Sequence, residues 1–125
     1  MNLTVLWQFI LLPLLLTQLI ELPIALLIIK EKPHWLIILS VIGLNFITNP
    51  LLNLFLFLSA RSGIPLALSL VIGEIIVFIV EMAGFKLFLE RVWSSCAKYA
   101  LVLNGASFLI GLGLNYAHFI FKLLL

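Results

Sequence analysis

The chain has 125 residues, of which 65% are hydrophobic and only 10% are charged, and its formal net charge is +2. Soluble domains contain roughly half apolar residues, so this composition excludes an ordinary soluble domain and indicates a membrane protein. The small positive charge gives no reason to expect a nucleic-acid partner, because the uneven placement of basic residues described below accounts for it.

Four long apolar runs follow one another along the chain, at about residues 3–29, 35–58, 64–85 and 97–121. Each has about 20 residues or more, which is the length that a helix needs to cross the hydrocarbon core of a bilayer. None alternates polar and apolar residues at period two, as the strands of a membrane barrel do. We therefore expect a polytopic membrane protein of the all-α class, with one transmembrane domain over residues 1–125.

The connections between these runs are short and polar. Residues 30–34 and 59–63 leave so little chain that consecutive helices must be antiparallel neighbours, which predicts an antiparallel four-transmembrane-helix bundle. The third connection, 86–95, reads KLFLERVWSS and has several apolar residues. We expect it either to prolong the third helix or to lie in the membrane interface.

Basic residues are divided unequally between the two sides of this predicted bundle. Lys and Arg are enriched in the cytoplasmic connections of membrane proteins. The distribution therefore predicts a multi-pass protein of the cell inner membrane with both termini on the extracytoplasmic side. The first and third connections hold Lys30, Lys32, Lys86, Arg91 and Lys98, and the opposite side holds Arg61 and Lys122.

Three glutamates, Glu21, Glu74 and Glu81, lie inside the apolar runs. An acidic side chain at bilayer depth costs roughly 2–3 kcal/mol or more on insertion scales, so these residues are expected to face protein. No Lys or Arg lies in the interior of a span to neutralise them. Loss of hydration therefore favours neutral carboxyl groups unless a cation is bound.

Small and polar residues mark one face of the second and fourth runs. Asn45, Asn49 and Asn53 recur every fourth residue with Thr48 beside them, and in lipid such side chains join helices by hydrogen bonds. The face of the fourth run consists of Ala97, Ala100, Asn104, Ser107, Gly111, Asn115 and His118. We predict a buried polar seam that gathers Glu21, Asn45, Thr48, Asn49, Glu74, Glu81, Asn104 and Ser107.

The two halves of the chain share a pattern of four residue types. Glu21 is followed by Asn45 and Thr48, and Glu81 is followed at nearly the same spacing by Asn104 and Ser107. This indicates a parallel internal repeat of two helical hairpins about an axis along the membrane normal, an arrangement that some transporters use to frame a central site.

Three functions are compatible with such a seam. The first is transporter-like binding or relay of a proton or small cation, which requires a homo-oligomer or a membrane-protein partner because four helices enclose no wide pore. The second is a non-catalytic subunit or assembly factor of a larger membrane complex, in which the seam holds helices together. The third is an intramembrane enzyme acting on lipid, although no nucleotide-binding or hydrolase motif occurs and no cofactor or catalytic residue is predicted.

Metal ligands are scarce in the predicted spans. The two histidines, His34 and His118, fall near opposite ends of the bundle, and neither a histidine nor a cysteine lies beside the glutamates. A proton or a hard cation therefore fits the seam better than a transition metal.

Four segments carry a resemblance to a known group of proteins. They are ELP at Glu21, NFITNP at Asn45, GEIIVFIVEMAGFKLF around Glu74 and LNGASFLIGL around Asn104. Together they resemble a group of small four-helix membrane proteins of prokaryotes, to which no activity is attached. Some of those proteins have His at the position of Asn49, so a metal role would not carry over to this chain.

Overall fold

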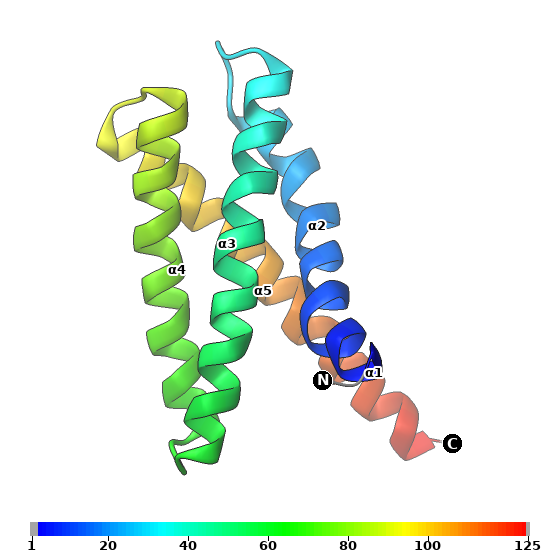
Figure 1. Ribbon diagram of the computed structural model, residues 1–125. Coiled ribbons are helices and arrows are strands. Elements are labelled where there is room, and N and C mark those ends of the chain that lie inside the picture. The colour runs from blue at the N-terminus through cyan, green and yellow to red at the C-terminus, as the bar shows by residue number, and fades with distance from the viewer. Residues whose placement is uncertain (1–2, 125) are drawn as a thin grey trace.

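The computed structural model describes residues 3–124 and is all-α, as the sequence predicts (Figure 1). Its four main helices are α2 (Leu12–Ile28), α3 (His34–Arg61), α4 (Leu66–Leu89) and α5 (Trp93–Leu124). Three of them, α3, α4 and α5, are long and apolar enough to cross a membrane, and α2 is a shorter apolar helix of 17 residues.

The N-terminal segment changes its helical hydrogen-bond pattern before α2 begins. A short α1 (Leu3–Leu6) is followed by a π turn, η1 (Trp7–Leu11). Pro13 lies in the first turn of α2, and because it has no amide hydrogen it cannot complete the regular ladder there. The first predicted span is thus helical over its described length, with a π turn that the sequence pattern did not predict.

The connections lie at two ends of the molecule. Residues 29–33 and 90–92 lie at the upper end of Figure 1, and residues 62–65 lie at the lower end. Much of the predicted third connection is helical, because α4 continues to Leu89 and α5 begins at Trp93. Glu90 ends α4 with a left-handed φ of 51°, and its N–H donates to the Lys86 carbonyl at 3.2 Å.

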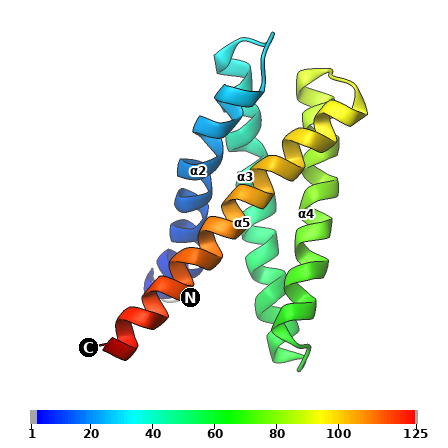
Figure 2. The ribbon, with the colours of Figure 1, turned by 180° about the vertical axis from the view of Figure 1, so that it is seen from behind.

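The helices bury their apolar side chains mainly toward the upper end. We call the following buried residues the upper core: Ala25, Ile29, Ile37, Val41, Leu44, Phe85, Leu89, Cys96, Tyr99, Ala100 and Leu103. Helix α3 packs between α2 and α4, while α5 crosses the bundle obliquely and contacts both α2 and α4 (Figure 2).

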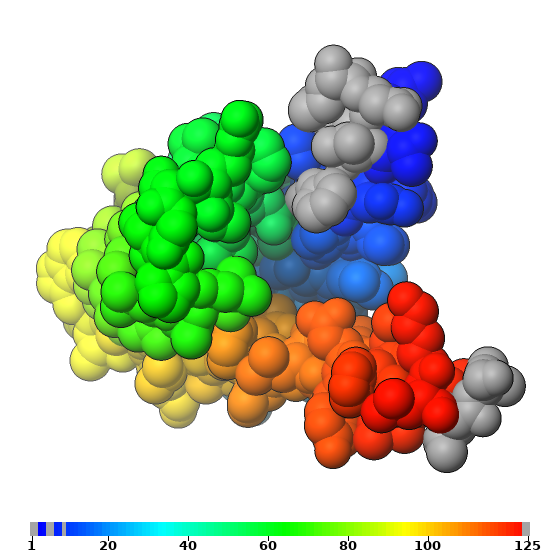
Figure 3. All heavy atoms as spheres, turned by 90° about the horizontal axis from the view of Figure 1, so that it is seen from below, coloured from blue at the N-terminus to red at the C-terminus, as the bar shows by residue number. Residues whose placement is uncertain are grey.

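The C-terminal end of α5 is the least packed part of the described chain. Residues 112–123 are all exposed, and seen from below these turns stand apart from the lower ends of α3 and α4 (Figure 3). The predicted small and polar face of this helix therefore packs only over its first half. Asn115 and His118 continue the pattern but remain exposed.

Candidate functional site

Glu21 lies on the inward face of α2 and is only 1% exposed. Each of its carboxyl oxygens accepts one hydrogen bond from another helix. The Asn45 amide of α3 donates to Oε2 at 2.8 Å, and the Ser107 hydroxyl of α5 donates to Oε1 at 2.8 Å. The carboxyl group thus joins three helices.

Glu81 has the corresponding environment on α4 and is also 1% exposed. The Thr48 hydroxyl of α3 donates to Oε1 at 2.8 Å, and the Asn104 amide of α5 donates to Oε2 at 2.5 Å. Glu21 and Glu81, which we call the carboxyl pair, are close enough to interact electrostatically.

The hydrogen bonds of the pair follow the repeated residue pattern, except that the two hydroxyl donors are exchanged between the halves of the sequence. Each glutamate accepts from the asparagine of its own half, Asn45 or Asn104. Each also accepts from the hydroxyl group of the other half, so that Glu21 is bonded to Ser107 and Glu81 to Thr48. The two halves are therefore tied together by the pair.

The two hydroxyl groups each have a second acceptor within reach. Thr48 Oγ1 lies 3.0 Å from the Leu44 carbonyl, and Ser107 Oγ lies 3.2 Å from the Asn104 carbonyl. A hydroxyl group has one hydrogen, so it donates either to the glutamate or to the helix carbonyl, and it accepts with its lone pairs in either case.

Polar contacts continue from the pair toward the lower end of the bundle. The Asn49 amide donates to the Thr17 hydroxyl at 3.0 Å, and the Asn53 amide donates to Asn49 Oδ1 at 2.9 Å. Thr17 was not among the predicted site residues. It lies four residues before Glu21, and this helical spacing is the signal that places both on one face.

A small inner cavity of about 120 Å³ lies beside the pair. It borders seven of the eight predicted seam residues, namely Asn45, Thr48, Asn49, Glu74, Glu81, Asn104 and Ser107, together with Thr17, Leu52, Val77 and Phe108. The eighth, Glu21, is bonded to two of these residues. No Lys, Arg or His lines this cavity in the described part of the chain.

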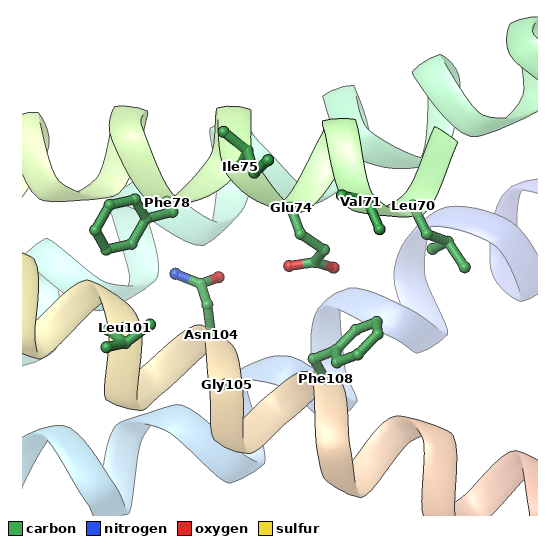
Figure 4. Close-up of a pocket in the computed structure, with 9 residues that line it drawn as sticks. All are labelled: Leu70, Val71, Glu74, Ile75, Phe78, Leu101, Asn104, Gly105 and Phe108. Carbon is green, nitrogen blue, oxygen red and sulfur yellow. The ribbon is translucent and has the colours of Figure 1, made fainter. Parts of the chain in front are cut away.

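Glu74 differs from the carboxyl pair. It is half-buried on α4, and among residues 3–124 no side chain or backbone group hydrogen-bonds to its carboxyl oxygens. It also borders a second, outer cavity between α4 and α5, into which its carboxyl group points (Figure 4).

In the described part of the chain, no group of three or more His, Cys, Asp or Glu side chains is placed so that it could hold a metal ion. Comparison with protein families, with curated proteins and with solved structures finds no match. The chemistry of the seam is therefore the basis on which a function can be argued.

Proposed function

We propose that this protein is an integral membrane protein with four antiparallel spanning helices, and that its carboxyl pair binds and exchanges protons. Both termini are then extracytoplasmic in an inner membrane. The placement of charge supports this orientation, since the connections that carry Lys30, Lys32 and Arg91 lie at one end of the molecule (Figure 1).

The observation that carries the proposal is the chemistry around Glu21 and Glu81. Four neutral donors hold the two buried carboxyl groups, and no cationic side chain takes part. Two carboxylates this close in a low-dielectric interior repel each other, so one of them is stabilised by taking up a proton. Such pairs titrate as a unit rather than as independent groups.

The hydroxyl groups allow either glutamate to change protonation state with little movement. When Glu81 is ionised, Thr48 donates to it. When Glu81 is protonated, its O–H donates to Thr48 Oγ1, and the Thr48 hydrogen turns to the Leu44 carbonyl. Ser107 can serve Glu21 in the same way through the Asn104 carbonyl.

The inner cavity supplies a place for water beside the pair. Its volume of about 120 Å³ is several times what one water molecule requires, and its polar walls offer the needed hydrogen-bond partners. Proton exchange between Glu81 and the lower end of the bundle would pass through this cavity, along the line of Asn49 and Thr17.

A proton fits the pair better than a metal ion, because an amide or hydroxyl group lies within hydrogen-bond distance of each of the four carboxyl oxygens. A metal ion would have to displace these donors from the oxygens it binds.

The shared pattern of the two halves of the sequence supports a parallel two-hairpin repeat as the origin of the pair, with its axis between the hairpins.

The test is the pH dependence of thermal stability in detergent. Glu81→Gln keeps the shape of the side chain and imitates its protonated form, since the new amide can donate to Thr48 and accept from Asn104. We expect the variant to fold and to lose most of the pH-dependent change in melting temperature that the wild type has. Glu90→Gln, in an exposed connection, is the matched control and should keep that change.

Two outcomes would contradict this proposal. One is a Glu81→Gln variant that folds and retains the full wild-type pH dependence. The other is a wild-type melting temperature that rises with Na⁺, K⁺ or Mg²⁺ at constant pH and does so only when Glu81 is present, because the site would then bind a small cation.

A second candidate function is supported by the exposed end of α5. Asn115 and His118 are polar, lie in a helix apolar enough to cross a membrane, and contact no other described helix closely enough to be buried. Polar side chains in that position are better accommodated against another protein than against lipid. We propose that this face meets a second copy of the chain or a partner subunit, as a subunit or assembly factor would require.

The contact can be tested by cysteine crosslinking in native membranes. Cys96 is the only cysteine and is buried, so Asn115→Cys introduces a single accessible thiol. A disulfide-linked dimer would identify a second copy, and a larger product would identify a partner. Leu109→Cys, an exposed position near the middle of the same helix, serves as the control for random collision.

A further inference from the structure

The outer cavity lies between α4 and α5 and has a volume of about 410 Å³ (Figure 4). Its walls are almost entirely Leu, Val, Ile and Phe side chains, with Phe78 and Phe108 on either side of its polar groups. Small-molecule sites in proteins are mostly apolar hollows of about 300–1,000 Å³ with a few polar groups, and this cavity falls within that range.

When Glu74 is ionised, as it is beside a bound cation, the two polar groups of the cavity are both hydrogen-bond acceptors. The Glu74 carboxyl group points into the space, and the side-chain oxygen of Asn104 is on the side that faces Glu74 (Figure 4). The Asn104 amide nitrogen is already used, because it donates to Glu81 and to the Ala100 carbonyl. The cavity thus presents acceptors without a donor.

The environment of Glu74 makes a positively charged ligand the best complement. No described residue donates a hydrogen bond to its carboxyl group, and no cationic side chain lines the cavity. A carboxyl group at membrane depth is most stable when paired with a cation. The aromatic surfaces of Phe78 and Phe108 also favour a cation over a neutral ligand.

From these features we infer that the outer cavity binds a lipophilic ammonium ion, that is, an apolar chain or ring bearing one protonated nitrogen. The nitrogen donates to Glu74 and to the Asn104 oxygen, and the apolar part fills the space between α4 and α5. Glu74 and Asn104 also border the inner cavity, which Glu81 lines, so the two cavities share these two residues. The site does not depend on proton exchange by the carboxyl pair.

The probes are 4-phenylbutylammonium and its neutral analogue 4-phenylbutanol. Binding is measured by calorimetry on the full chain in nanodiscs of phosphatidylcholine and phosphatidylglycerol, with empty discs subtracted. We expect the wild type to bind the ammonium ion at least about tenfold more tightly than the alcohol. In Glu74→Gln this preference should disappear, while Glu90→Gln, exposed in a connection, should keep it.

A second variant fills the cavity without touching Glu74. A Cβ placed on Gly105 meets nothing within 4 Å, so Gly105→Leu can extend into the cavity without a backbone clash. We expect this variant to fold and to lose binding of both probes.

Three results would overturn the inference: a wild type that does not bind the ammonium ion, a Glu74→Gln variant that binds it as tightly as the wild type, or a Gly105→Leu variant that binds both probes normally. Competition by added phosphatidylethanolamine would also overturn it, because the occupant would then be a lipid headgroup rather than a free lipophilic amine.

Discussion

The upper and lower halves of this molecule are held together in different ways. In the upper half, the four helices bury a continuous set of apolar side chains, the upper core. In the lower half, α5 diverges and its last turns are exposed, while α2 and α3 are joined by polar contacts such as the Asn49 to Thr17 hydrogen bond. The carboxyl pair lies at the boundary, one helical turn below the core residues Ala25 and Phe85.

The membrane location that we propose gives this difference a physical basis. Lipid tails are as apolar as leucine, so burial of apolar surface does little to associate helices, and close packing or hydrogen bonding must do so instead. The upper half uses small residues that allow close approach, such as Ala25, Ala100 and Gly84. The lower half has a close approach of α3 and α4 at Gly73 and Leu52, but α5 diverges there, and the inner cavity lies beside its polar side chains.

The largest effect on stability is expected when a larger side chain is introduced into the closely packed upper half. A Cβ on Gly84 would overlap the side chain of Leu44, which is buried and would have to shift within the upper core. Gly84→Leu should therefore lower the free energy of unfolding by about 1–3 kcal/mol, measured by denaturation in mixed micelles. Gly113→Leu, in the exposed end of α5, should change stability by less than about 0.5 kcal/mol.

Equal losses of stability in the Gly84 and Gly113 variants would show that the upper core is packed no more closely than the exposed end of α5.

The next largest effect on stability is expected from the Thr48 and Ser107 hydrogen bonds, which link the N-terminal and C-terminal halves of the sequence through the carboxyl pair. Thr48→Val and Ser107→Ala each remove a hydroxyl donor from the carboxyl pair and should cost on average about 0.6 kcal/mol, with an upper value of about 1.7 kcal/mol. Ser62→Ala, whose hydroxyl donates only to its own helix, is the control. If both seam variants lose no more stability than this control, the hydroxyl groups do not stabilise the carboxyl pair.

A similar change in the lower half should cost less. Asn49→Leu removes the hydrogen bonds to Thr17 and from Asn53, but the site borders a cavity in which the partners can find water. We expect a loss of at most about 0.6 kcal/mol in the same denaturation assay. A loss of stability exceeding that of Thr48→Val would mean that the lower polar contacts stabilise the bundle more than the hydrogen bonds of the carboxyl pair do.

The smallest effect is expected at the exposed ion pair that joins the two upper connections. Glu31 accepts from Arg91 at 2.9 Å, and this hydrogen bond raises the pKa of the Arg91 guanidinium. A group whose pKa is raised on folding stabilises the fold below its ordinary pKa and loses that contribution only as the pH rises through the raised value. The pair therefore persists at neutral and mildly alkaline pH.

Because both side chains of this pair are accessible to water, Glu31→Gln should leave the melting temperature unchanged within error. Lys32→Gln provides the control for the loss of one neighbouring charge. A clear drop for Glu31→Gln alone would assign this connection a structural role that its exposure does not predict.

The sequence predicted the all-α class and the buried positions of Glu21 and Glu81, because an acidic residue within an apolar span has few alternatives to facing protein. Helical periodicity likewise placed Asn45, Thr48 and Asn104 on inward faces. The exchange of hydroxyl donors between the halves was not predictable, since it depends on how each helix rotates about its axis. The pattern on α5 also continues unchanged past Gly111, so it gave no sign that Asn115 and His118 would be exposed.

The central claim is that Glu21 and Glu81 take up protons inside the bundle. Infrared difference spectra recorded between acidic and alkaline buffer report the C=O stretch of protonated carboxyl groups directly. We predict that the wild type has carboxyl bands that vanish on raising the pH, and that Glu21→Gln and Glu81→Gln each alter them while Glu90→Gln does not. Spectra of both seam variants that match the wild type at every pH would contradict the account.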